Sequence, residues 1–511
     1  MPRPRVSRSC GNCRAIKRRC DQQRPHCGQC TRLREKCPGY RNPWELIFRD
    51  QTDQTIQRFQ KRELKYTAAG VVPHISPSPH TLNPCPNMEQ VGVNYFLHHF
   101  VTGDHRASRG YLNYVPAALG ARDNHPTLVV SLAAVGLVAL ANSTHQPELV
   151  RHARVKYAEA IRSVNTALAS PTESVKDSTL MAVISLGVFE HFSQFDSWTR
   201  HVQGAAALMV LRGKDQFSSS HGHNSPVAIL LFNQVRADMV VACMHSNRPF
   251  PEDMRALQEE ASKHVDASSA FWRLGVLATQ CVDFLWRVTE STGPNKTLWR
   301  DLLDAALVLQ HDFQAVMGLL AVREPYVTIV PTTQQGVTAR MADPDLIYNG
   351  RADLYSTSWT IKVWNNARNL QMIVSEIICY LVRKLLAMDS AAPVNTCAAR
   401  SQYQLLLHET LGILFRLGED ILATVPQVLG IISSPSEPDP FVNTNAASLG
   451  VSVSGGYLLT WCLYMVGKSP ATANQARKWI IRCFRNIVQG SGIGMGLPLL
   501  EEIVRIDRLA G

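Results

Sequence analysis

Apolar residues recur at intervals of three and four positions through most of the chain from Met88 onward. Two segments show this spacing most clearly, and each would form one continuous apolar face on a helix. They are Leu302, Leu303, Leu309, Phe313, Val316 and Leu320, and then Leu370, Ile373, Val374, Ile377, Ile378, Leu381 and Leu385. Alternation of apolar and polar positions, which would indicate strands, is rare. A segment of about 420 residues can bury a large core, so residues 88–511 are predicted to form a large all-α domain, either as one unit or as two fused halves.

Segments rich in glycine, proline, serine and asparagine interrupt this pattern and predict loops near 218–226, 325–353 and 433–448. Residues 71–87 contain Pro73, Pro77, Pro79, Pro84 and Pro86, which favours an extended, flexible linker over a helix. Residues 44–66 mix apolar and charged positions and could form a short helix. Their apolar residues do not keep a heptad over three repeats, so a dimerising coiled coil at this point stays an open alternative.

Two features bear on the compartment. Residues 1–10 lack the apolar stretch of a secretory signal. The longest nearly uninterrupted apolar run, 128–141, is shorter than the roughly 18 residues that a membrane-spanning helix needs. We therefore expect a reducing compartment and no membrane partner.

Six of the 13 cysteines lie close to the N-terminus in two copies of one spacing, C-x2-C-x6-C. They are Cys10, Cys13, Cys20, Cys27, Cys30 and Cys37. So short a segment cannot build its own hydrophobic core and needs either disulfides or a metal to cross-link it. The other seven cysteines are scattered singly, mostly among apolar residues, as reduced core cysteines are. Metal is therefore favoured over disulfides.

An all-thiolate site favours Zn²⁺ in tetrahedral coordination. Six ligands are two more than one ion needs, whereas two ions need eight ligand bonds. Six thiolates supply eight bonds only when two of them bridge, so a binuclear cluster follows if all six bind. Two Zn²⁺ ions and six thiolates carry a net charge of about −2, which nearby basic residues would offset.

With its six cysteines, an intervening basic run and Pro25, the segment from Cys10 to Cys37 resembles the fungal Zn2Cys6 binuclear-cluster domain. The resemblance implies two zinc ions bridged by the first and fourth cysteines, here Cys10 and Cys27. It also implies two short helices and recognition of CGG-like triplets in double-stranded DNA.

The basic run lies between the second and third cysteines and reads Arg14-Ala-Ile-Lys17-Arg18-Arg19. On a short helix, capped by Ser9 or Asn12, Arg14, Lys17 and Arg18 would share one face. Such a helix fits the major groove, where Lys or Arg reads guanine. Alone, the run would be read as a solvated basic face or a nuclear-import signal.

By family position, Lys17 is the candidate base-reading residue, whereas Arg14, Arg18 and Arg19 are candidate phosphate or helper contacts. Ile16 is left out of the DNA contacts because it could pack on the cluster. Residues 1–50 hold 13 Lys and Arg against 4 Asp and Glu, a net charge of about +9 of the chain's +11. Basicity is therefore concentrated around the cysteines, as in a nucleic-acid-binding module.

A second resemblance is to the fungal transcription-factor middle region. It rests on Glu190, Trp198, His201, Gly204, Ala205, Leu208, Arg212 and Gly213, and on 425–430 and 455–461. Trp198, His201, Ala205 and Leu208 would share one helix face, and Gly213 suits a helix C-terminus. His201 is expected to be a core histidine rather than a catalytic one. The sequence has no phosphate loop, no G-x-S-x-G and no H-E-x-x-H, so an enzyme is not expected.

The sequence therefore predicts a mainly α protein with a zinc cluster at 8–40, a linker at 41–87 and an all-α regulatory domain at 88–511. The predicted function is that of a nuclear, sequence-specific transcription factor of RNA polymerase II genes. By resemblance, its targets would be metabolic or secondary-metabolite genes. A homodimer, a small-molecule effector and transcriptional co-regulators are further candidate partners. The alternative is a ligand-sensing or protein-binding scaffold in which the cluster is an interaction module.

Overall fold

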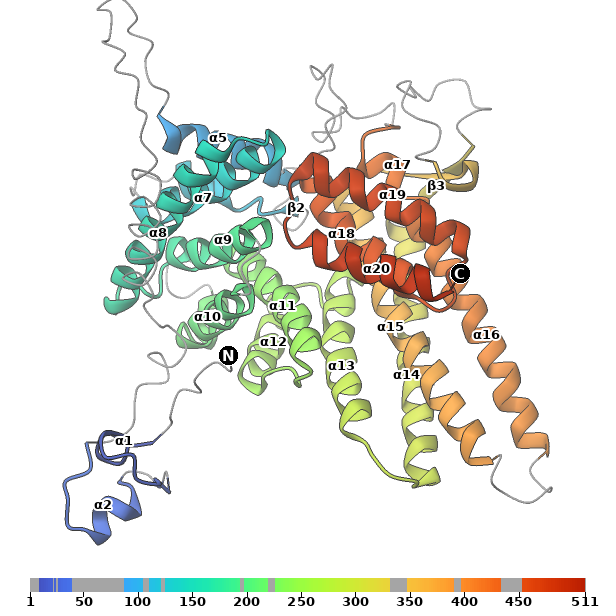
Figure 1. Ribbon diagram of the computed structural model, residues 1–511, viewed down its shortest axis with the longest axis horizontal. Coiled ribbons are helices and arrows are strands. Elements are labelled where there is room, and N and C mark those ends of the chain that lie inside the picture. The colour runs from blue at the N-terminus through green and yellow to red at the C-terminus, as the bar shows by residue number, and fades with distance from the viewer. Residues whose placement is uncertain are drawn as a thin grey trace, which may run out of the picture. The chain divides into compact units, whose positions relative to one another are not determined.

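The computed structural model describes residues 9–21, 23, 26–38, 87–103, 110–120, 125–193, 197–218, 226–330, 347–389, 397–432 and 453–510 (Figure 1). The chain divides into two compact units, Met1–Pro84 and Cys85–Gly511. A short cysteine-rich segment precedes a large helical region, which confirms the predicted mainly α fold class. The predicted helix at 44–66, the proline-rich segment, Pro25 and the loop at 433–448 lie outside the described residues.

In the first unit, the cysteine-rich segment forms two one-turn helices, α1 (Gly11–Ala15) and α2 (Gly28–Arg32). Each begins directly after the first cysteine of a C-x2-C pair, so that Cys10 and Cys27 are the N-cap residues. Among the described residues of this unit, the buried apolar cluster consists of cysteines alone. The fold of this segment therefore depends on what the thiols bind.

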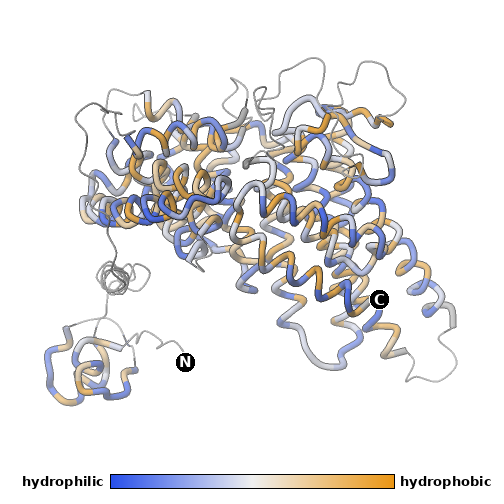
Figure 2. Tube along the Cα trace, turned by 45° about the horizontal axis from the view of Figure 1, so that its top comes forward, coloured by the Kyte–Doolittle hydropathy of each residue, from blue (hydrophilic) through white to orange (hydrophobic). Residues whose placement is uncertain are grey.

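The first half of the helical unit contains α5 (Met88–Phe100), α6 (Val115–Gly120), α7 (Pro126–Ser143), α8 (Pro147–Ala169), α9 (Asp177–Ser193) and α10 (Trp198–Leu211). It continues with α11 (Pro226–Ser246), α12 (Glu252–Ser262) and α13 (Ala270–Glu290). Helix α7 packs against α5, α8 and α9. It is apolar on nearly all sides, as expected for a helix surrounded by other helices. Figure 2 shows apolar and polar residues mixed along the helices of this unit.

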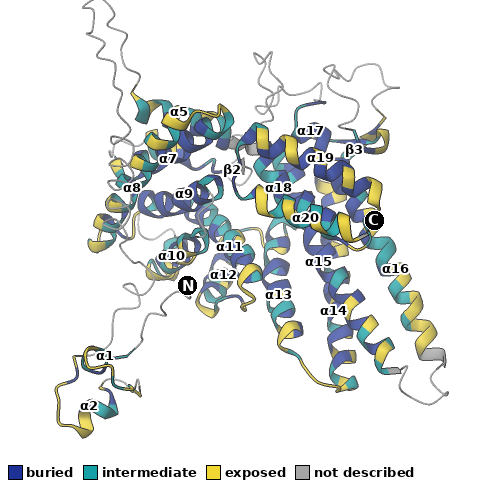
Figure 3. Cartoon of the chain, viewed as in Figure 1, coloured by how far each residue is buried: buried dark blue, intermediate teal, exposed yellow. Residues whose placement is uncertain are grey.

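The second half begins with three long helices, α14 (Lys296–Arg323), α15 (Ser358–Asp389) and α16 (Cys397–Leu422), of which α15 packs against both others. A one-turn helix, α17 (Val425–Val428), precedes α18 (Val453–Lys468), α19 (Asn474–Ser491) and α20 (Gly496–Ala510). In Figure 3, α14 and α15 are coloured as buried along much of their length. The predicted apolar faces of these two helices are buried, which confirms the helical interpretation of both segments.

Strands are few among the described residues, and they form two small antiparallel pairs. Strand β1 (Thr102–Gly103) pairs with β2 (Gly110–Tyr111), and β3 (Tyr326–Ile329) pairs with β4 (Ala352–Tyr355). The prediction of a loop at 325–353 is therefore wrong at both of its ends. The sequence pattern missed this pair because each strand has only four residues and alternation over so short a segment carries little signal.

Three helices are long and apolar enough to cross a membrane by length and composition alone, namely Pro126–Ser143, Val227–Ser246 and Lys296–Arg323. The expectation that only 128–141 approaches a span was therefore too narrow. All three helices pack against other helices of the same unit, α7 on α5, α11 on α13 and α14 on α15.

Five of the scattered cysteines are free and buried in the helical unit, and burial raises the pKa of each thiol. They are Cys243, Cys281, Cys379, Cys462 and Cys483. This confirms their prediction as reduced core cysteines. The side chains of Cys85 and Cys397 lie outside the described residues.

Candidate metal centre and nucleic-acid interface

The six N-terminal cysteines come together as two overlapping groups of four thiols. One group is Cys10, Cys13, Cys20 and Cys27, and the other is Cys10, Cys27, Cys30 and Cys37. Within each group, all sulfur atoms lie within 4.8 Å of one another. The two groups share two members, Cys10 and Cys27, so six thiols provide two sets of four. This is the arrangement that counting ligand bonds requires of a binuclear cluster.

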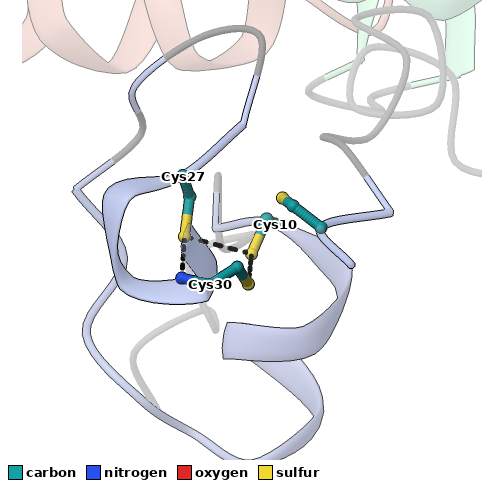
Figure 4. Close-up of side chains that lie close together, drawn as sticks. Cys10, Cys27 and Cys30 are labelled. Carbon is teal, nitrogen blue, oxygen red and sulfur yellow. Dashed lines mark hydrogen bonds between the residues drawn. The ribbon is translucent and has the colours of Figure 1, made fainter. Parts of the chain in front are cut away.

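Distances between sulfur atoms distinguish a metal from disulfides. Cys10 Sγ lies 3.7 Å from the Sγ atoms of both Cys27 and Cys30 (Figure 4). Cys13 Sγ lies 3.6 Å from Cys27 Sγ. A disulfide would require about 2.05 Å. Four sulfurs at about 2.3 Å from one zinc ion in a tetrahedron lie about 3.8 Å apart. The spacing therefore fits thiolates around zinc.

The repeated spacing explains how the backbone presents these thiols. Because each C-x2-C pair spans the first turn of a helix, its two side chains point to the same side. The Cys30 amide donates to Cys27 Sγ at 3.3 Å, and the Cys10 amide donates to Cys20 Sγ at 3.4 Å. Amide N–H groups directed at sulfur stabilise the thiolate form that binds metal.

Protonation of the shared cysteines links zinc binding to pH. Burial is the main cause that raises the pKa of the Cys10 thiol. At Cys27, the hydrogen bond from the Cys30 amide lowers the pKa, but burial and the neighbouring thiols outweigh it and raise the pKa to about 12. Without metal both groups are thiols, so zinc must displace their protons, and its affinity should rise with pH.

Arg18 connects the two halves of the cysteine cluster. Its Nε donates to Cys13 Sγ at 3.4 Å, and its Nη2 lies 3.7 Å from Cys30 Sγ and 2.7 Å from Glu35 Oε2. The hydrogen bond to Glu35, followed by that to Cys13, raises the pKa of the guanidinium. Arg18 thus places a positive charge against the cluster, where it offsets the excess of thiolate charge.

The predicted single helix through the basic run is wrong. Helix α1 ends at Ala15, and Lys17 has a left-handed backbone with φ 53°. The chain turns there because it must return to Cys20, and the Arg18 amide donates to the Cys13 carbonyl at 2.7 Å. Lys17 and Arg19 are exposed. Arg14 lies in α1, whereas Lys17 and Arg18 follow its end, so these three residues do not share one helical face.

Three details near α1 also differ from expectation. Ile16 is 62% exposed and does not pack on the cluster. Neither Ser9 nor Asn12 caps α1, because its N-cap is Cys10. Instead, Asn12 Nδ2 donates to the Lys36 carbonyl at 3.1 Å, and Arg14 Nη1 donates to the Ser9 carbonyl at 3.3 Å. The first contact joins α1 to the second cysteine repeat, and the second joins the start of the basic run to the residue before Cys10.

Sequence reasoning missed two acidic residues that organise the cluster. Glu35 is the partner of Arg18. Asp21 Oδ1 accepts hydrogen bonds from the amides of Gly28 at 3.0 Å and Gln23 at 3.4 Å, and so joins the two cysteine repeats. A Cβ at Gly28 would collide with the Asp21 carboxylate, so any other residue there would displace that carboxylate. Glu35 and Asp21 are among the few acidic residues of a strongly basic segment. Their scarcity was the sequence signal that could have identified them.

The second motif forms part of the helical core. Tyr157 of α8 donates a short hydrogen bond to Glu190 of α9 and lies 3.1 Å from His201 Nε2 of α10. Ala205 and Leu208, on the predicted face of α10, are buried. Gly213 follows the end of α10 with φ 73°, as predicted. His201 thus contributes to packing between three helices.

Comparison with protein families identifies both regions. Residues 8–45 match the fungal Zn(2)-Cys(6) binuclear cluster domain, and residues 66–256 match the fungal specific transcription factor domain. The first resemblance is thereby confirmed, and so is the second for residues 190–213, whereas 425–430 and 455–461 lie beyond the matched range. No curated protein and no solved structure matches the chain significantly. The chain carries a DNA-binding module that holds two zinc ions and a domain found in fungal transcription factors, and its role is in transcription regulation. Neither family is enzymatic, which fits a role other than catalysis.

Proposed function

We propose that this protein is a nuclear, sequence-specific regulator of RNA polymerase II genes. The observation that carries the proposal is the pair of four-thiol groups sharing Cys10 and Cys27. This segment is held by two zinc ions and lies within the 50 residues that carry about +9 of the chain's net charge of +11, so it is suited to binding DNA. The nuclear location is inferred from the two transcription-factor domains.

The six cysteines would each bind zinc, with Cys10 and Cys27 bridging the ions. The sulfur separations of 3.6 and 3.7 Å around these two residues support this assignment. We propose the domain division 8–40, 41–87 and 88–511, in which the all-α domain regulates what the cluster binds.

For DNA contact, Lys17 remains the candidate base-reading residue. It is exposed at a turn, and no described side chain covers it or forms an ion pair with it. Arg19 and Arg14 would contact phosphates. Arg18 is a weaker candidate for direct contact, since Glu35 and two cysteines already occupy its guanidinium. We assign it the role of positioning the turn that presents Lys17.

The test is binding of the full-length, zinc-loaded protein to duplexes that contain or lack CGG triplets, at two salt concentrations. Tighter binding to CGG duplexes, with affinity falling as salt rises, is expected. Equal affinity for both duplexes would refute sequence-specific recognition. A zinc-loaded protein that fails to retain any duplex at low salt would favour the alternative, a protein-binding module.

A further inference from the structure

A hollow of the helical unit lies between the first half of α19 and a short 3₁₀ helix, η4 (Tyr348–Gly350), with the residue before it. Its volume is about 530 Å³, which is within the range of protein binding sites. None of the residues that line it belongs to the cysteine unit. The hollow is therefore a candidate site distinct from the zinc cluster.

The floor of the hollow, by which we mean its less exposed lining residues, is aromatic and aliphatic. Tyr348 and Trp479 pack with their ring centres 5.4 Å apart, and they are only 9% and 8% exposed. Ile347, which precedes Tyr348 in the chain, is half-buried and also lines the hollow. Because the two rings are held by their own packing, this apolar floor is formed before anything binds to it.

The rim of the hollow, by which we mean its exposed lining residues, is positively charged. Lys478 and Arg482 line it, and because they lie four residues apart they are neighbours on one face of α19. Arg485, also exposed, continues this basic face. Helix α19 contains no Asp or Glu. Glu419 of α16 accepts from Asn349 Nδ2 at 3.4 Å but does not line the hollow, which therefore presents cations and no carboxylate.

Exposure of the rim distinguishes between classes of ligand. Asn349, Gln475, Lys478 and Arg482 are all exposed, so the hollow is open, whereas a small-molecule site buries most of the surface of its ligand. The phosphates of a nucleic acid would pair with the cations but would leave the apolar floor without a partner. A peptide that carries both acidic and apolar side chains matches the rim and the floor together.

We propose that this hollow binds an acidic peptide segment of another protein. One aromatic or large aliphatic side chain of the peptide lies on the floor formed by Ile347, Tyr348 and Trp479. Carboxylates on either side of that residue pair with Lys478 and Arg482, and charge complementarity of this kind gives specificity and speeds association. The hollow thus gives the helical unit a protein partner of defined chemistry, whichever DNA sequence the zinc cluster binds.

The experiment uses the full-length, zinc-loaded protein and the fluorescein-labelled peptide Gly-Asp-Asp-Phe-Asp-Asp-Gly as the probe. Fluorescence anisotropy compares it with two control peptides, in which Ser replaces Phe or Asn replaces every Asp. The parent peptide should bind saturably and more weakly as salt rises, and both control peptides should bind less tightly. If the Asn peptide binds as tightly as the parent, the cationic rim is not used, and if the Ser peptide does, the floor is not used. Either result overturns the proposal.

Because the cysteine unit is also basic, variants of the helical unit must locate the binding. Lys478→Glu should weaken binding of the parent peptide by about tenfold or more. Arg273→Glu is the matched control, since Arg273 is an exposed cation of α13 that does not line the hollow, and it should leave binding unchanged. An equal effect of both variants would refute the proposal.

A second variant tests the floor without changing charge. Ile347→Ala should weaken binding of the parent peptide but not that of the Ser peptide, which has no side chain for the floor. An equal effect on both peptides would contradict the assigned role of Ile347 and overturn the proposal. Titration of a DNA duplex separates the remaining possibility. If Lys478→Glu lowers affinity for the duplex and leaves peptide binding unchanged, this surface contacts DNA and the proposal is wrong.

Discussion

Arg18 and Glu35 form an ion pair of 2.7 Å between Nη2 and Oε2, and this pair joins the first cysteine repeat to the second. The side chain of Arg18 is 19% exposed, less than that of Glu35 at 42%. Since the same guanidinium also contacts Cys13 and Cys30, its position is set by the cluster. Lys17, next to it, has no such contact with any described residue. Two adjacent basic residues therefore have different physical environments.

This difference predicts opposite outcomes for two neighbouring substitutions. Arg18→Ala should speed the loss of zinc to a chelator, because the thiolates lose a compensating charge. Lys17→Ala should leave zinc release unchanged but weaken binding to the preferred duplex by about 1–3 kcal/mol and relax its specificity. Zinc release followed with a colorimetric chelator, together with titration of matched duplexes, would check both.

Arg18→Lys is the control for charge alone, since lysine cannot reach Cys13 and Glu35 in the same forked geometry. It should fall between wild type and Arg18→Ala in zinc release. If Lys17→Ala weakens binding to all duplexes equally, Lys17 contacts phosphate rather than a base. If Arg18→Ala retains zinc as well as wild type, the charge-compensation argument fails.

The shared positions of Cys10 and Cys27 predict unequal effects among the six cysteines. Cys27→Ser should deprive both metal sites of a ligand, whereas Cys20→Ser and Cys37→Ser should each affect only one. Elemental analysis of purified full-length variants should therefore find less zinc per chain in Cys27→Ser than in the other two. Equal zinc content in all three would contradict the bridging arrangement.

Removal of zinc should affect the two units differently. The helical unit has its own large apolar core, whereas the described part of the cysteine unit has only thiols at its centre. A chelator should therefore abolish DNA binding while leaving most of the far-ultraviolet circular dichroism unchanged. A large loss of helical signal would show that the helical unit depends on the metal.

The cysteine cluster could be predicted from the sequence because ligand number and tetrahedral geometry leave few solutions. The backbone path between the six cysteines could not be predicted in the same way. The spacing of Arg14, Lys17 and Arg18 fits a helix, yet the helix ends at Ala15 so that Cys20 can return to the cluster. Local periodicity is overruled here by contacts among thiols distant in sequence.

In the helical unit, too, local sequence patterns predict only the structure that local contacts determine. Long helices such as α14 and α15 were predictable because their apolar faces repeat over many turns. Strand β4 was not, because its stability comes from far along the chain. Gln427 donates from Nε2 to the Tyr355 carbonyl at 2.9 Å and accepts from the Tyr355 amide at 2.8 Å, across 72 residues. No local pattern contains that contact.

The crossing of α5 and α7 leaves no room for one added methyl group. Gly136 of α7 meets Gly92 of α5, and a Cβ at Gly136 would lie 1.8 Å from the Gly92 carbonyl oxygen. Gly136→Ala must separate the helices, which should cost about 1–3 kcal/mol or more despite the better helix propensity of alanine. Urea denaturation of the full-length protein should show a lower midpoint.

Gly318 provides the matched control, since it also lies in a long helix, but a Cβ added there would have no neighbouring atom within 4 Å. Gly318→Ala should stabilise the protein by about 0.5–1 kcal/mol, because alanine is the better helix former. A loss of stability in both variants, or in neither, would contradict the role assigned to the crossing.

His191 predicts how the helical unit responds to acid. Its Nδ1 lies 2.9 Å from the Tyr457 hydroxyl, which links α9 to α18. Burial, followed by the charge of His201, lowers the pKa of His191 to about 4. The unfolded chain, with an ordinary histidine pKa near 6.5, therefore binds this proton more readily than the folded protein does. Stability from this group is fully present above about pH 6.5 and is lost as the pH falls towards 4, by about 3 kcal/mol in total.

His191→Gln should remove the pH-dependent stability that comes from His191. The free energy of unfolding of this variant should therefore fall less between pH 6.5 and pH 4 than that of the wild-type protein. Tyr457→Phe is the control that separates burial from the hydrogen bond, because it keeps the ring but removes the hydroxyl. If burial is the main cause, as we infer, Tyr457→Phe should retain most of the wild-type slope. Urea denaturation at a series of pH values would measure all three. Parallel curves for wild type and His191→Gln would show that this histidine does not control the acid response.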